Sequence, residues 1–278
     1  MNHDWEGQFN PRKAVPDFER YVVASKAKSD QAHQRFTDIE ELRYGSTPLS
    51  NFNYRRASRS GQPLFVFIHG GYWRSRDKND FGYLFTAMEG SDVNVAILNY
   101  DLCPAVTVAQ IAEQMRQAII WLHANAKTLG FDPERIFVAG QSAGAHLIAM
   151  ILAQPPARFG LPDGMVRKAY LSSGIYELSP VLKITVNDEV RLKEGDVHPL
   201  SPIHFPPSLK TPYDIVVGGA EPERWIAQSV EFARHVSDSG GQARFTIMPG
   251  RNHFSIMHDL ETPDGVLAAK IIADMKAA

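Results

Sequence analysis

The stretch that most constrains the fold is residues 135–152, RIFVAGQSAGAHLIAMIL. An apolar run from Ile136 to Ala139 is followed by the turn-forming residues 140–144, GQSAG, and then by an apolar, helix-favouring segment. This order predicts a strand, a sharp turn and a helix, with Ser142 at the apex of the turn. Glycines two residues before and after the serine fit a strained turn, where neighbouring backbone leaves no room for side chains. The pattern favours a nucleophilic serine over a serine in a purely structural turn.

The remaining pattern predicts an α/β protein. Continuous apolar runs at 64–68 (LFVFI), 93–100 and 213–217 are typical of strands buried on both faces. Further strands are expected at 166–172 and 243–248, edge strands at 40–44 and 51–56, and helices at 107–129, 223–237 and 265–275. Strands that alternate with helices predict a mostly parallel central sheet with helices on both faces.

The chain is expected to form a single domain overall, in two parts. Residues 1–45 carry apolar residues at irregular helical spacing among many charges, which predicts a helical arm over residues 18–36. We expect this arm to pack on the core of its own chain or on a partner subunit. Residues 46–278 form the main domain, with an irregular insertion bordering the site at about 179–212, rich in proline and histidine.

Composition excludes several classes of protein. The formal net charge of −2 gives no electrostatic reason to expect nucleic acid or an anionic membrane as a partner. Cys103 is the only cysteine, so no internal disulfide forms. The polar N-terminus and the absence of a run of about 20 apolar residues predict a cytoplasmic protein. Histidines lack HxH or HxxxH spacing and no glycine-rich phosphate motif appears, so no metal and no cofactor are expected.

Four segments at the ends of predicted strands carry the chemistry, and functional groups of parallel sheets gather at those ends. They are HGGYW (69–73), GQSAG (140–144), GGAE (218–221) and PGRNHF (249–254). A neutral serine hydroxyl needs an adjacent base, and His253 directly follows the last strand, where the order serine, acid, histidine requires one. His69 and His146 flank the motifs and are expected to be structural.

The imidazole in turn needs a carboxylate to fix its tautomer and to stabilise its protonated form. Glu221 lies just beyond the penultimate strand, 32 residues before His253. Glu223, in the following helix, and Asp214, inside the strand, are the alternatives.

Backbone amides complete the predicted site by binding the oxyanion that forms during acyl transfer. We expect one from Ala143, directly after the nucleophile, and others from Gly71 and Tyr72 in the HGGYW segment. The alternative for this segment is a structural glycine turn.

With these residues in place, the chain from about residue 40 to its C-terminus resembles the α/β-hydrolases. HGGYW, in place of the HGGG of hormone-sensitive-lipase-like esterases, resembles kynurenine formamidases of the serine-hydrolase type. The VPDF segment of the arm and the residues Glu221-Pro222-Glu223, followed by Gln228-Ser229, also resemble bacterial formamidases. The resemblance implies a small-molecule substrate, N-formyl-L-kynurenine, which is hydrolysed to formate and kynurenine in tryptophan catabolism. Together with the exposed arm it suggests a homodimer.

The residues also suggest how that substrate is bound. Tyr72 and Trp73 are expected to stack on its aromatic ring, and Arg74 or Arg76 to bind its carboxylate unless they are simply solvated. Two other functions stay open: a short-chain carboxylesterase with the same machinery and a different pocket, and a non-catalytic binding module on a hydrolase scaffold.

Overall fold

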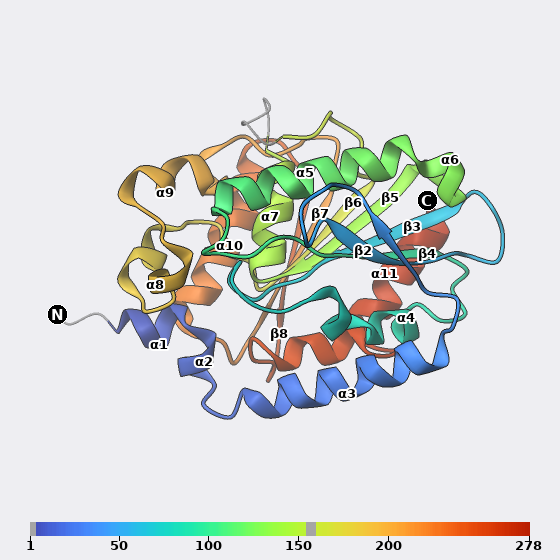
Figure 1. Cartoon of the computed structure of the whole chain (residues 1–278). Helices are drawn as coiled ribbons and strands as arrows, with labels where there is room; N and C mark the ends of the chain where they lie inside the picture. Colours follow the sequence, from blue (N-terminus) through green and yellow to red (C-terminus); the bar gives the residue numbers. More distant parts are fainter. Residues whose placement is uncertain (1–3, 154–159) are drawn as a thin grey trace.

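The computed structural model of the protein describes residues 4–153 and 160–278, so the first three residues of the predicted arm lie outside it. An eight-stranded sheet runs through the centre, with helices on both faces (Figure 1). Its strands are β1 (Glu40–Arg43), β2 (Asn51–Arg55), β3 (Gln62–Ile68), β4 (Asn94–Leu98), β5 (Phe131–Gln141), β6 (Lys168–Ser172), β7 (Tyr213–Gly218) and β8 (Ala243–Met248). The predicted α/β class is confirmed.

The strand order is β1-β2-β4-β3-β5-β6-β7-β8. The strands from β4 to β8 are all parallel, whereas β1–β2 and β2–β4 pair antiparallel. The prediction of β2 as an edge strand was therefore wrong, because β1 covers its outer side. The chain leaves β3 towards β4 and then returns to place β5 on the other side of β3. Ligands of open parallel sheets bind at such a reversal, outside the carboxyl ends of the strands.

Each face of the sheet carries its own apolar core. On one face Leu64, Val66 and Ile68 of β3 pack with α5 (Val108–Ala124), α7 (Ala143–Ile151) and α10 (Glu223–Asp238). On the other, Phe65 and Phe67 pack with α3 (Glu19–Arg35), α4 (Tyr83–Ala87) and α11 (Val266–Ala277). Each fully buried side chain of this kind stabilises the fold by about 1.5–3 kcal/mol. Burial on both faces explains why β3 is apolar without alternation.

The N-terminal arm packs on its own chain. The short helices α1 (Trp5–Phe9) and α2 (Pro11–Ala14) lie at the end of the molecule near α8 (Asn187–Val190), and α3 runs along the α4 side of the sheet (Figure 1). The Ser29 hydroxyl donates to the Asp80 carbonyl oxygen at 2.8 Å. The sheet begins at Glu40, inside the range predicted for the arm, so the arm ends before β1.

Two other predictions need correction. The helix expected at 107–129 is divided at Asn125 into α5 and α6 (Ala126–Leu129), because the Asn125 side chain donates to the Trp121 carbonyl oxygen and closes the first helix. The segment expected to be irregular contains α8, α9 (Glu194–Leu200) and the 3-10 helices η2 (Ser179–Lys183) and η3 (Pro202–His204). The remaining 3-10 helices are η1 (Lys78–Phe81) and η4 (Ser255–Leu260).

Candidate active site

Ser142 stands at the sharp turn between β5 and α7, as the motif predicts. Its backbone has φ 55° and ψ −118°, a conformation that L residues rarely adopt. A Cβ on Gly144 would lie 2.0 Å from the Ile68 carbonyl oxygen, and one on Gly140 would lie 2.7 Å from the Gly144 carbonyl carbon. Both glycines are therefore required by close backbone approach. The Ala143 amide, at the first position of α7, donates no hydrogen bond to another described residue.

The second set of amides comes from the His69–Trp73 segment, which follows β3. Because Ile68 pairs with Gly140 across the parallel β3–β5 ladder, this segment lies beside the serine turn. Tyr72 and Trp73 have φ of 52° and 57°. Within the part of the chain that the structure describes, the Gly71 and Tyr72 amides have no hydrogen-bond acceptor.

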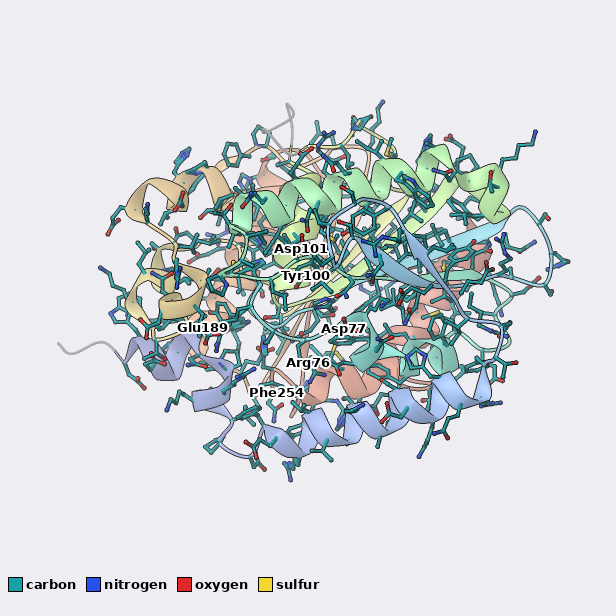
Figure 2. All side chains as sticks on the ribbon, in the orientation of Figure 1. Arg76, Asp77, Tyr100, Asp101, Glu189 and Phe254 are labelled. Atoms are coloured by element: carbon teal, nitrogen blue, oxygen red, sulfur yellow. The ribbon has the colours of Figure 1, made fainter. Side chains whose placement is uncertain are left out.

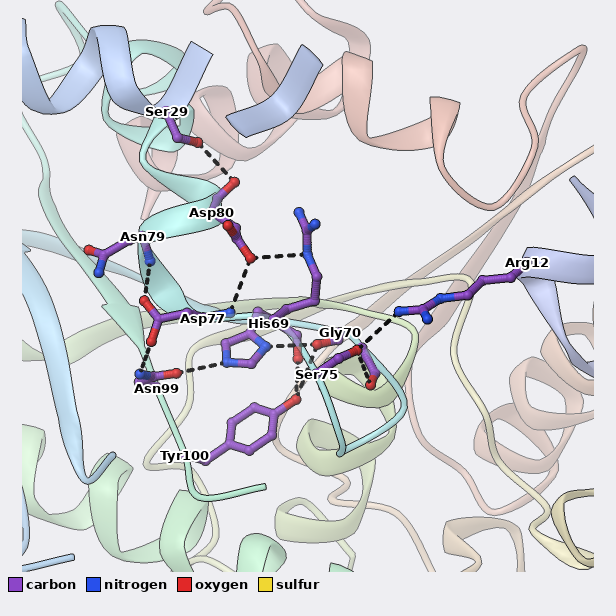
Figure 3. A network of polar contacts seen from close by, with 12 residues as sticks. Arg12, Ser29, His69, Gly70, Ser75, Asp77, Asn79, Asp80, Asn99 and Tyr100 are labelled. Atoms are coloured by element: carbon purple, nitrogen blue, oxygen red, sulfur yellow. Dashed lines mark hydrogen bonds and ion pairs between the residues drawn. The ribbon is translucent and has the colours of Figure 1, made fainter. Parts of the chain in front are cut away.

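A buried polar network holds this segment by its carbonyl groups (Figure 3). The Tyr100 hydroxyl donates to the His69 carbonyl oxygen at 2.8 Å, and His69 Nδ1 donates to the Gly70 carbonyl oxygen at 2.7 Å. His69 Nε2 lies 3.0 Å from Asn99 Oδ1, and the Asn99 amide donates to Asp77 Oδ2. These hydrogen bonds fix the His69 and Gly70 carbonyl groups, and they leave the Gly71 and Tyr72 amides available to donate to a ligand.

His253 and Glu221 form a buried pair. The His253 Nδ1–H donates to Glu221 Oε2 at 2.7 Å, and the Glu221 side chain is fully buried. Gln141 Nε2 donates to the His253 carbonyl oxygen at 3.0 Å, which ties the histidine loop to the serine turn. The Trp225 ring packs edge-on against the imidazole with centroids 4.7 Å apart. Ser142 and His253 line one cavity of about 100 Å³, the Ser142 cavity.

Ser173, which the sequence analysis did not single out, contacts the acid. Its hydroxyl donates to Glu221 Oε1 at 2.5 Å, and the Gly218 amide donates to the same oxygen at 2.8 Å. Each carboxylate oxygen of Glu221 therefore has a donor. A signal for Ser173 existed, since it directly follows β6 at the same end of the sheet.

The alternatives for the acid lie elsewhere. Asp214 lies in β7 and pairs with Lys168 and Lys270 at 3.1 and 3.0 Å. Glu223 is exposed at the start of α10.

His146 is buried among neutral partners. Its Nε2 donates to the Leu200 carbonyl oxygen at 2.8 Å, while its Nδ1 accepts from the Trp73 indole at 3.2 Å. Burial lowers the pKa of His146 to about 4, and burial also lowers the pKa of His69. Neither ring lines the Ser142 cavity, so both are structural in this fold.

Trp73 corrects the prediction for substrate contact. It is fully buried, packs against His146, donates its indole N–H to that ring, and does not line the cavity. Tyr72 does line the cavity, and its hydroxyl donates to the Phe9 carbonyl oxygen of α1 at 2.6 Å.

The cavity wall combines aromatic rings with arginines. Phe254, Tyr21 and Phe18 line it, with Tyr21 stacked on Phe254 at 6.1 Å between centroids. Arg74 and Arg76 line it as the sequence suggested, and so does Arg12 of α2, which the sequence analysis did not identify. Figure 2 shows Arg76 and Phe254 in this region, with Glu189 on α8.

Two features are absent from the described ranges, 4–153 and 160–278. They contain no group of three or more His, Cys, Asp or Glu side chains that could hold a metal ion. Within them, no helix has both the length and the apolar character needed to cross a membrane.

The chain is similar in sequence to known hydrolases. The BD-FAE family model matches residues 52–157, which include the HGGYW and GQSAG motifs. The chain is 26% identical to a kynurenine formamidase of Drosophila melanogaster over 94% of this chain and 90% of the relative. It is 28% identical to one of Salmo salar over 95% and 93%. An isoprenylcysteine alpha-carbonyl methylesterase of Arabidopsis thaliana is 33% identical over 76% of this chain, which spans 55% of that relative.

Solved structures show the same fold. A candidate thioesterase from Silicibacter sp. TM1040 superposes with a TM-score of 0.82 and 25% identity, covering 95% of this chain and 98% of that one. An esterase from Pyrobaculum calidifontis has a TM-score of 0.79 at 18% identity, covering 97% and 94%. The protein is a hydrolase of the α/β-hydrolase superfamily, related to the kynurenine formamidases.

Proposed function

We propose that the protein hydrolyses a small acyl group by an acyl-serine mechanism, with Ser142 as nucleophile, His253 as general base and Glu221 as its carboxylate. The observation that carries this is the buried His253–Glu221 hydrogen bond behind a cavity that Ser142 also lines. A histidine whose Nδ1 donates to a carboxylate has its Nε2 free to accept the serine proton.

In this mechanism, Ser142 Oγ attacks the carbonyl carbon while His253 Nε2 takes the hydroxyl proton. The tetrahedral oxyanion is bound by the amides of Ala143 and of Gly71 or Tyr72, which have no other acceptor among the described residues. The protonated imidazole then donates its proton to the leaving atom. Water, activated by His253, releases the acyl group as its acid and restores the serine.

The substrate we propose is N-formyl-L-kynurenine, which yields formate and kynurenine. Formyl is the smallest acyl group, so little space is needed on the acyl side of Ser142. The leaving group is an aromatic amine, and the Phe18, Tyr21 and Phe254 rings in the cavity wall suit such a ring. The kynurenine formamidases among the relatives, which align over nearly the whole chain, support this choice.

A short-chain carboxylesterase is the second candidate, supported by the esterases among the relatives. A spectrophotometric assay separates the two by comparing N-formyl-L-kynurenine with p-nitrophenyl acetate and butyrate. A kcat/KM for the formamide well above those for the esters is expected, and the reverse order would favour the esterase. Activity on none of them would favour a binding module.

The mechanism itself is tested with Ser142→Ala. Loss of several orders of magnitude in kcat is expected, because no other nucleophile replaces the hydroxyl. Turnover near the wild-type rate would exclude the acyl-serine mechanism.

We further propose that the chain works as a single domain whose N-terminal arm forms part of the cavity wall. The cytoplasmic location, the homodimer and the absence of nucleic-acid binding are proposals from the sequence. Light scattering tests the dimer directly.

A further inference from the structure

The Ser142 cavity carries more positive charge than its own residues neutralise. Arg12, Arg74 and Arg76 all line it. Arg74 pairs with Glu189, and Arg76 Nε lies 3.3 Å from Asp80 Oδ2. Arg12 has no ion pair with any described residue, so three arginines face two carboxylates and one positive charge is left over.

The contacts of Arg12 are weak ones. Its Nη2 donates to the Ser75 hydroxyl at 3.4 Å, a long hydrogen bond, and its guanidinium lies 5.3 Å from the centre of the Phe18 ring. Burial, followed by the like charges of Arg74 and Arg76, lowers the pKa of Arg12. Arg74 Nε is also buried without a hydrogen-bond partner among the described residues. An anion bound here would relieve the repulsion among these guanidinium groups.

The arm holds Arg12 in place at the cavity. Asn10 caps α2 by accepting from the Arg12 amide at 3.2 Å, and Pro11 occupies the first helical position. The Tyr72 hydroxyl donates to the Phe9 carbonyl oxygen, which fixes the arm to the segment beside Ser142. The guanidinium therefore belongs to a structured wall rather than to a free chain end.

The neighbours of Arg12 decide which anion fits. Phe18 and Tyr21 follow it along the arm and line the same cavity with Phe254. A ligand that fills this side of the cavity meets aromatic rings and a guanidinium together, which suits an arene bearing a carboxylate.

We propose that Arg12 binds the carboxylate of the leaving group and makes the enzyme selective for acylated aromatic amino acids over neutral aryl amides and esters. This inference rests on the proposed function, because the leaving group is defined by acyl transfer to Ser142. Arg74 lines the same cavity and adds its positive charge to that of Arg12.

The test compares N-formyl-L-kynurenine with its carboxamide, which keeps the ring and the formyl group but has no negative charge. We expect Arg12→Gln to lower the ratio of kcat/KM for the acid over the amide about tenfold, mainly through KM, since a charge-assisted hydrogen bond is lost. The des-amino acid, which retains the carboxylate, should show the same dependence. Lys13→Gln is the matched control: it removes an adjacent exposed cation that does not line the cavity, and should leave the ratio unchanged.

A purely structural role of Arg12 would give a different result from carboxylate binding. The Ser75 hydroxyl donates to the Gly71 carbonyl oxygen at 3.0 Å, so Arg12 could instead brace this loop (Figure 3). In that case Arg12→Gln and Ser75→Ala would both lower kcat on acid and amide alike. An unchanged acid-to-amide ratio in Arg12→Gln would overturn the proposal.

Binding to Ser142→Ala separates this inference from the proposed function. The dissociation constant of L-kynurenine, followed by tryptophan fluorescence, should rise about tenfold when Arg12→Gln is added to Ser142→Ala. That rise is expected even if Ser142→Ala retains turnover and the acyl-serine mechanism fails. Equal affinities in the two variants would refute carboxylate binding by Arg12.

Discussion

Ser173 should act on catalysis only through Glu221. The fully buried carboxylate has the His253 imidazole on one oxygen, and the Ser173 hydroxyl and Gly218 amide on the other. Ser173→Ala removes one of these donors. A hydrogen bond to a charged group contributes about 1.5–3 kcal/mol. Because the Gly218 amide remains, we take the lower end, about 1.5 kcal/mol, which corresponds to about a tenfold loss in kcat.

The backbone at Ser173 provides a matched control. Its φ is 49°, so alanine is strained there as serine is, whereas glycine is not. Ser173→Gly also lacks the hydroxyl but relieves that strain by about 1 kcal/mol. Both variants should lose kcat to the same extent with little change in KM, while Ser173→Gly should unfold at higher urea concentration than Ser173→Ala.

Steady-state kinetics and urea unfolding of the two variants test this reasoning. Recovery of wild-type kcat by Ser173→Gly would show that backbone strain, not the hydroxyl, causes the loss. A double-mutant cycle adds a second criterion: on a Glu221→Ala background, Ser173→Ala should change kcat less than twofold, or about 0.4 kcal/mol. A further tenfold fall there would refute action through Glu221.

Two further predictions concern the frame of the site. Gly144→Ala places a Cβ 2.0 Å from the Ile68 carbonyl oxygen, so α7 must move away from β3. We expect the free energy of unfolding in urea to fall by about 1–3 kcal/mol. We also expect kcat to fall, because Ser142 and the Ala143 amide move with α7. Unaltered kinetics would contradict the close contact. His146 has a native pKa of about 4, below its unfolded value of about 6.5, so the unfolded state binds its proton first as pH falls. Its stabilising effect is complete above the unfolded pKa and is lost towards pH 4, by about 2 kcal/mol between pH 7 and 5. His146→Gln should reduce the fall in unfolding free energy over this range, and an identical fall in both proteins would refute the assignment.

The fold and the residues proposed for catalysis could be identified from the sequence because their signals are local. The strand, turn and helix around Ser142 follow from one continuous pattern, and the reversal at β3 and β5 brings the two glycine-containing segments together. The prediction of β2 as an edge strand was wrong for a physical reason. The composition of a strand indicates whether its side chains are buried, but it does not indicate which strands lie on either side of it. Nothing within residues 51–56 shows that β1 folds back on its outer side.

Cavity-lining residues that depend on contacts between distant segments could not be identified from local sequence patterns. Tyr72 and Trp73 are adjacent aromatics in a loop without periodicity, so nothing in the sequence indicates which one lines the cavity and which one packs on His146. Arg12 belongs to a charged arm where a cation is ordinarily solvated. Its place at the cavity depends on contacts such as that of Tyr72 with Phe9, between residues 63 positions apart.

The residues proposed for catalysis and those proposed for leaving-group selectivity belong to different parts of the chain. The proposed chemistry depends on segments fixed to the ends of parallel strands, where register and buried hydrogen bonds leave little freedom. The BD-FAE match, residues 52–157, contains Ser142 and the HGGYW segment but not Arg12, Phe18 or Tyr21. Most of the side chains that would meet the leaving group therefore lie outside the matched region, on the N-terminal arm. Substitution of an arm side chain such as Arg12 can therefore alter which leaving group is accepted, while the backbone contact of Phe9 with Tyr72 keeps the segment beside Ser142 in place.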